Sequence, residues 1–159
     1  GELPIPVGGA GFTGTGRADR IDEFPGGALS VLDYKTGYAP TAKQVASLLA
    51  PQLPLEAAMV KRGAFEGVAA GGSVEELAYV GLRGGTPPVT VTPVATKEGS
   101  IDELAGRAFE RLVALLGRYR SPGSGYPSRT AIAFEREFAG DYDHLARVRE
   151  WSLGGGEDS

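Results

Sequence analysis

A buried strand that ends in charged residues is the feature that most limits how this chain can fold. The stretch ALSVLDYKTG, residues 28–37, begins with the apolar side chains of a sheet interior and ends at Asp33 and Lys35. Side chains two residues apart share one face of a strand, so this carboxylate and this ammonium emerge together. Such a polar pair does not suit a sealed interior. We therefore expect one end of this strand to open onto a polar site.

A glycine-rich turn joins this strand to an earlier one that carries another carboxylate. The letters PGG separate FTGTGRADRIDEF from the apolar strand, which is the pattern of an antiparallel hairpin. If the turn is centred there, paired residues have numbers that sum to about 52. This register places Asp19 opposite Asp33 and Asp22 opposite Ser30. Directly opposed carboxylates repel, and a bound cation between them would relieve that repulsion.

The hairpin thus predicts a site for a divalent cation. Mg²⁺, with Mn²⁺ as the alternative, takes one or two carboxylates, retained waters and a substrate phosphate. We expect Asp19 and Asp33 to hold the ion and the backbone carbonyl of Tyr34 to add a ligand. Lys35 could orient an attacking water or stabilise charge in the transition state. The reaction that fits is hydrolysis of a phosphodiester.

The charged residues of the hairpin also have simpler interpretations than a metal site. A D-x-K sequence at the end of a strand is often only a solvated terminus with a surface ion pair. Arg20 and Asp22 lie on the opposite face of the hairpin, where their spacing favours a structural ion pair.

The rest of the chain predicts helices and further strands. A helical pattern over 41–65 is interrupted by two prolines, and a clearer helix follows over 100–119. Each begins with a capping box, Thr41 with Gln44 and Ser100 with Glu103. VEELAYVGLRG and VTVTPVAT read as strands between them, and DYDHLARVREWS as a final helix. The apolar face of the 100–119 helix predicts a buried side made of Leu104, Phe109, Leu112, Val113, Leu115 and Leu116.

Composition narrows the class of protein further. The 159 residues include no cysteine, which rules out disulfides, thiolate zinc sites and a cysteine-held iron–sulfur cluster in this piece. The net charge of −4 gives no overall basic field to attract nucleic acid. No apolar run approaches the roughly 20 residues that span a bilayer. We expect a cytoplasmic protein with no membrane partner.

The quoted motifs resemble a known family. GRADRIDEFPGGALSVLDYKTG followed by APQLPLEA is similar to the RecB-type nuclease module of the PD-(D/E)XK superfamily, in which G-x-x-D-R-I-D, D-Y-K-T-G and Q-x-x-x-Y occur in this order. The stretch YPSRTAIAFEREFAGDYDHLARVREWS resembles the C-terminus of AddB-type subunits of bacterial helicase–nuclease complexes. Glu56 stands where the third motif has its tyrosine. The family's earliest acidic or histidine ligand precedes the first strands, and we expect it to lie ahead of this chain.

The resemblance implies a fold and a set of site residues. The fold is α/β and restriction-endonuclease-like, with a mixed central sheet flanked by helices. Asp19 and Asp33 become metal ligands, Lys35 the catalytic lysine, and Gln52 a residue that shapes the active site and contacts DNA. We expect residues 1–159 to form one nuclease-like domain cut from a larger helicase–nuclease subunit. Its predicted parts are a hairpin core over 1–37, a Q-motif helix over 41–65, strands and a helix over 76–120, and a tail with a helix over 121–159.

The implied activity is Mg²⁺-dependent exonucleolytic cleavage of single-stranded DNA in double-strand break repair, alongside an AddA-like partner subunit. Two alternatives stay open. One is a catalytically inactive scaffold or DNA-guiding module of the same complex, and the other is a stand-alone RecB-like exonuclease.

Overall fold

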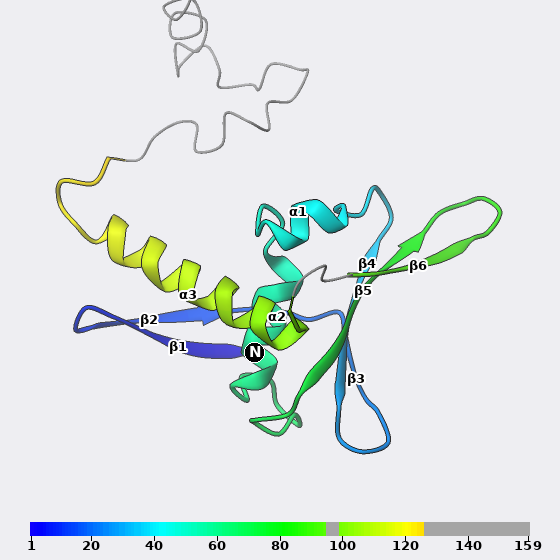
Figure 1. Ribbon diagram of the computed structural model, residues 1–159, viewed down its shortest axis with the longest axis horizontal. Coiled ribbons are helices and arrows are strands. Elements are labelled where there is room, and N and C mark those ends of the chain that lie inside the picture. The colour runs from blue at the N-terminus through cyan, green and yellow to red at the C-terminus, as the bar shows by residue number, and fades with distance from the viewer. Residues whose placement is uncertain (95–98, 126–159) are drawn as a thin grey trace, which may run out of the picture. The chain divides into compact units, whose positions relative to one another are not determined.

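The computed structural model describes residues 1–94 and 99–125 (Figure 1). The chain divides into two compact units, Gly1–Ser121 and Pro122–Ser159, and every element named below lies in the first. The predicted helix over 141–152 lies outside the described residues. In chain order the elements are β1 (Glu2–Val7), β2 (Ala10–Thr15), β3 (Arg20–Glu23), β4 (Leu29–Lys35), α1 (Ala42–Ala46), α2 (Gln52–Lys61), β5 (Val74–Leu82), β6 (Val89–Pro93) and α3 (Ile101–Tyr119).

A mixed sheet forms the centre of the unit. Within the described residues its strand order is β3-β4-β5-β6, with β4 and β5 parallel and the two outer pairs antiparallel. The chain crosses from β4 to β5 through α1 and α2, because parallel neighbours need a long connection. The fold is α/β with a mixed sheet flanked by helices, which confirms the predicted fold class.

The hairpin register is the one that the turn predicted. Asp22 pairs with Ser30 and Arg20 with Leu32, so the paired numbers sum to 52. The turn is closed by the Phe24 N–H, which donates to the Ala28 carbonyl at 2.8 Å. Gly26 has a φ of 110°, a conformation that costs a residue with a side chain more than it costs glycine.

The first strand of the predicted hairpin is shorter than expected. Its early part belongs to β2, which pairs with β1 in a separate two-stranded sheet, and the chain bends between Thr15 and Arg20. A Cβ at Gly16 would lie 2.7 Å from the Met59 Sδ, so the chain crosses α2 at a point where a glycine fits closely. Gly16 lies in the segment that separates β2 from β3.

The predicted helix over 41–65 is two helices. The capping box of Thr41 and Gln44 starts α1 as expected, and α2 starts at Gln52 directly after Pro51. Pro54 lies in the first turn of α2, where backbone N–H groups lack helical partners in any case. Both prolines thus mark the start of a helix, and the predicted interruption is confirmed.

The hydrophobic core lies between the sheet and the two longer helices. It includes Val31 and Leu77 from the strands, Leu53 from α2 and Leu104 from α3, all between 0% and 1% exposed. Figure 1 shows α3 running on past α2 along the β1–β2 hairpin. The burial predicted for the whole apolar side of α3 is wrong at Leu115, which is 46% exposed because it lies beyond the sheet. The Ser100–Glu103 capping box is confirmed.

No helix in residues 1–94 or 99–125 has both the length and the apolar character needed to cross a bilayer.

Candidate active site

Asp33 and Lys35 lie together at the C-terminal end of β4. The burial of β4 alternates toward this end, with Asp33 buried, Tyr34 exposed and Lys35 half-buried. The Asp33 side chain is 3% exposed, and its Oδ2 lies 2.8 Å from the Lys35 Nζ. The two charges share a face, as the strand pattern predicted. They form an ion pair at the edge of the core, so the simple alternative of a solvated strand end is wrong for Asp33.

Gln52 joins this pair from the first turn of α2. Its Nε2 donates to the Asp33 Oδ1 at 2.6 Å, and its Oε1 accepts from the Lys35 Nζ at 3.2 Å. The connection between β4 and β5, which contains α2, thus places one amide in contact with both charged groups. The structure brings together three of the four predicted catalytic residues through hydrogen bonds and an ion pair, and the amide sets the orientation of both charges.

Glu56 is a member of the site whose role the sequence did not reveal. It lies four residues after Gln52, on the same face of α2, and its Oε1 accepts from the Gln52 Nε2 at 3.1 Å. The residue is 6% exposed, and its Oε2 has no hydrogen-bond partner. Burial raises the pKa of this carboxyl, and the charges of Asp33 and Asp19 raise it further. The four-residue spacing from Gln52 is the signal that places Glu56 here.

Asp19 approaches β4 from its other side. It is exposed and lies one residue before β3, so the paired strands end one step short of the predicted opposition with Asp33. Its Oδ2 accepts from the Tyr34 backbone N–H at 2.9 Å. The N–H and C=O of a strand residue point to the same edge, so the Tyr34 carbonyl faces the gap that β3 leaves. Asp19 and this carbonyl thus share an edge of β4.

Tyr79 forms the floor of the site and was also missed. It is the residue of β5 that pairs with Asp33, it is 1% exposed, and its hydroxyl has no hydrogen-bond partner. Burial first, then the charges of Asp33 and Glu56, raise the pKa of this phenol to about 12. The ring therefore stays neutral at physiological pH beneath the ion pair. Pairing with Asp33 on a neighbouring strand is the signal that could have found it, once the register of β5 was known.

Arg20 and Asp22 lie away from this cluster. The Arg20 Nε lies 2.8 Å from the Asp22 Oδ2 in an exposed ion pair. The predicted structural ion pair is confirmed.

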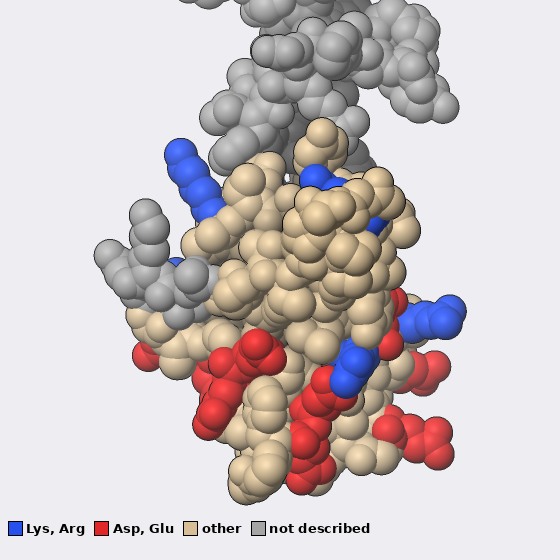
Figure 2. All heavy atoms as spheres, turned by 90° about the vertical axis from the view of Figure 1, so that its right-hand side faces the viewer, with Lys and Arg blue, Asp and Glu red and all other residues tan. Residues whose placement is uncertain are grey.

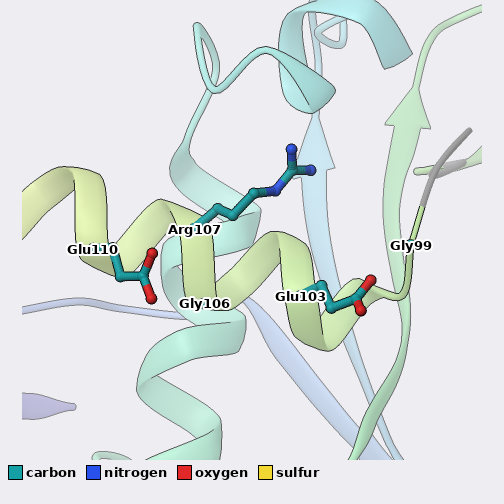
Figure 3. Close-up of a pocket in the computed structure, with 5 residues that line it drawn as sticks. All are labelled: Gly99, Glu103, Gly106, Arg107 and Glu110. Atoms are coloured by element: carbon teal, nitrogen blue, oxygen red, sulfur yellow. The ribbon is translucent and has the colours of Figure 1, made fainter.

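A hollow on the surface of α3 lies elsewhere. It has a volume of about 510 Å³ and is lined by Gly99, Glu103, Gly106, Arg107 and Glu110 (Figure 3). The Glu103 side chain caps α3 by accepting from the Ser100 N–H at 2.8 Å. Figure 3 shows the other charged side chains leaving α3 in different directions. None of the residues around Asp33 lines this hollow, so it does not belong to the candidate site.

The family follows from a comparison over most of the chain. The model of the PD-(D/E)XK nuclease superfamily matches residues 2–149. The chain belongs to this superfamily. Membership in the PD-(D/E)XK superfamily implies a hydrolase that acts on nucleic acids, and its nucleases generally use divalent metal ions.

Relatives of this PD-(D/E)XK chain are much longer proteins. An uncharacterized protein of Rickettsia bellii is 29% identical over 115 residues, which are 65% of this chain and 14% of that protein. An uncharacterized protein of Rickettsia typhi is 38% identical over 65 residues, which are 41% of this chain and 8% of that protein. No solved structure gives a significant match.

The side chains around Asp33 fit the divalent ion that PD-(D/E)XK nucleases generally use. Carboxylates of Asp19, Asp33 and Glu56 act on one another here, with Lys35 as the opposing positive charge. The buried Glu56 Oε2 accepts no hydrogen bond, and the buried Asp33 Oδ2 has the Lys35 ammonium as its partner. In the part of the chain that the structure describes, no three acidic, histidine or cysteine side chains form a ready-made metal cage. The donor set is therefore the sparse kind that Mg²⁺ takes when substrate phosphate completes its shell.

Proposed function

We propose that this chain hydrolyses phosphodiester bonds of single-stranded DNA with Mg²⁺, as the exonuclease module of an AddB-like subunit in a bacterial helicase–nuclease complex. The observation that carries the proposal is the buried Asp33 carboxylate, bound at once by Lys35 and Gln52 at the open end of β4. Burying such a cluster of charged and polar groups costs desolvation free energy, which favours a functional role for its charges. The superfamily supplies the reaction class.

Each side chain takes a role that its contacts support. Asp33 and Asp19, with the Tyr34 carbonyl, hold the cation. A divalent cation, when bound, lowers the pKa of a water and polarises a phosphoryl oxygen. The Lys35 ammonium stabilises the negative charge that develops on the phosphoryl oxygens, and the Gln52 Oε1 keeps the ammonium aimed toward that position. Positioning and electrostatics therefore carry most of the catalysis.

The larger context is proposed on the resemblance alone. The D-Y-K-T-G strand and the AddB-like stretch over 126–152 support a role in double-strand break repair beside an AddA-like partner. In that setting the motor feeds DNA to the site, which suits a chain with a net charge of −4. The proposed compartment is the bacterial cytoplasm.

A catalytically inactive scaffold of the same fold is the second candidate. One observation favours it: Glu56 replaces the motif's tyrosine and hydrogen-bonds to Gln52, which adds a carboxylate beside Asp33. A bound cation could relieve this extra charge, whereas an inactive scaffold would have to tolerate it.

Cleavage of labelled single-stranded DNA separates the two. The full chain with Mg²⁺ or Mn²⁺ should cut the strand, while Asp33→Ala and Lys35→Ala should each lose about 100-fold or more of the rate. Asp22→Ala is the matched control, because it removes an exposed carboxylate from the same hairpin. Equal rates in the wild type, Asp33→Ala and Lys35→Ala would contradict the catalytic assignment. No cleavage by any of the four proteins would favour the scaffold.

A further inference from the structure

Tyr38 is an aromatic ring held out in solvent beside the proposed catalytic lysine. Its exposed fraction is 91%, and the next most exposed large hydrophobic residue in the described part of the chain, Val91, reaches 60%. Tyr38 follows Lys35 by three residues, so even fully extended chain keeps their Cα atoms within about 11 Å. A ring this exposed contributes little to the core. Because it lies near the site, it is available to contact a bound ligand.

Arg83 lies close to this ring. Its guanidinium carbon lies 4.8 Å from the centroid of the Tyr38 ring. The Arg83 Nη2 also donates to the Gly37 carbonyl at 3.2 Å, which ties the loop after β4 to the end of β5. The contacts place a guanidinium close to a phenol ring that stays 91% exposed.

The pair lies at the edge of the sheet where the site opens. β4 and β5 are parallel, and Lys35 pairs with Gly81, two residues before Arg83. Loops at the carboxyl ends of parallel strands meet at one edge, which is where open α/β sheets bind ligands. Lys35, Tyr38 and Arg83 therefore line the same edge from two neighbouring strands.

The charge around this edge suits a polyanion. The segments 35–43 and 82–88 contain lysines and an arginine but no acidic residue, although the chain as a whole carries a net charge of −4. Figure 2 shows acidic side chains gathered on the lower half of the visible face. In Figure 1, the turn between β3 and β4 lies at this height. The loops at the C-terminal ends of β4 and β5 therefore add positive charge beside the carboxylates of Asp19, Asp33 and Glu56.

We propose that Tyr38 and Arg83 form a stacking subsite for one unpaired nucleobase of the strand that enters the site. An exposed aromatic face takes a base by stacking, and arginine adds a cation–π contribution and a phosphate contact. A base inside a duplex is already stacked on its neighbours and cannot enter without being unpaired. The subsite therefore selects single-stranded DNA over duplex DNA. This proposal rests on the proposed nuclease function.

Binding without cleavage tests the subsite. The probe is a fluorescent oligothymidylate, measured by anisotropy with the full chain in EDTA, beside a strand of the same length in which abasic residues replace the bases. Stacking contributes about 1–3 kcal/mol per base, so Tyr38→Ala should weaken oligothymidylate binding by about 5- to 150-fold. Tyr38→Phe keeps the ring and should stay within about twofold of the wild type. Neither substitution should change binding of the abasic strand.

The matched control is Phe24→Ala, which removes an exposed aromatic residue at the other end of the hairpin. It should bind both strands like the wild type. The subsite is overturned if Tyr38→Ala binds oligothymidylate as tightly as the wild type does, or if the wild type does not prefer oligothymidylate to the abasic strand.

The two proposals can fail separately. A wild type that cleaves DNA while Tyr38→Ala binds normally would remove the subsite and leave the nuclease. A binding loss in Tyr38→Ala with no cleavage by the wild type would keep the subsite and remove the nuclease.

Discussion

Replacing Gln52 by alanine tests whether this amide holds the buried carboxylates together. Its Nε2 donates to both the Asp33 Oδ1 and the Glu56 Oε1. Those two residues are 2% and 6% exposed, so water replaces the lost donor poorly. A hydrogen bond to a charged group contributes about 1.5–3 kcal/mol, and a buried acceptor left alone adds a penalty of its own. Because Gln52 itself is exposed and admits some water, we expect a total loss of about 2–3 kcal/mol.

Urea denaturation of the metal-free chain measures this loss directly. The matched control is Gln44→Ala, since the side chain of Gln44 only caps α1 in an exposed position and accepts from the Thr41 N–H at 2.8 Å. Loss of such a cap costs about 1 kcal/mol. If Gln52→Ala lowers the free energy of unfolding by no more than Gln44→Ala does, the amide does not organise the site.

Two further predictions concern pH and packing. Burial and neighbouring carboxylates raise the pKa of Glu56 in the folded state above its ordinary 4.5, so the folded state binds this proton more tightly than the unfolded state does. The wild type therefore loses stability as the pH rises from the ordinary pKa to the raised one. Glu56→Gln removes this titrating group. In EDTA, its free energy of unfolding relative to the wild type should rise between pH 4 and the raised pKa of Glu56 and then level off. A difference between the two proteins that does not vary with pH would refute this. Leu104→Ala should cost about 2–5 kcal/mol because the side chain is 1% exposed, whereas Leu115→Ala, at 46% exposure, should cost under about 1 kcal/mol. Similar losses for both leucines in thermal denaturation would show that the outer half of α3 is buried against something else.

Local rules were enough to predict the hairpin and its charged end. A glycine turn fixes the register of its two strands, and alternation along β4 then puts Asp33 and Lys35 on one face. Capping residues marked the starts of α1 and α3 for a similar reason, since they act on backbone groups three residues away. Features that depend on a few neighbouring residues are thus readable from the sequence.

The rest of the site depends on how distant segments meet. Gln52 came from the resemblance, because nothing local shows that α2 begins there and points its first turn at β4. Glu56 was noted only as a departure from the motif, because its contact with Gln52 depends on the placement of α2 on the sheet. Tyr79 was missed because its place beside Asp33 depends on the register of β5. The direct opposition of Asp19 to Asp33 was expected from register alone, but β3 begins at Arg20, one residue too late for it.

The central claim is that the buried end of β4 holds a divalent cation through Asp33. Titration of Mn²⁺ into the chain, followed by electron paramagnetic resonance of the free ion, tests this without any substrate. We predict a binding site in the wild type and in Asp22→Asn, and affinity lower by more than about tenfold in Asp33→Asn. Mn²⁺ binding of the same strength in Asp33→Asn as in the wild type would contradict the account.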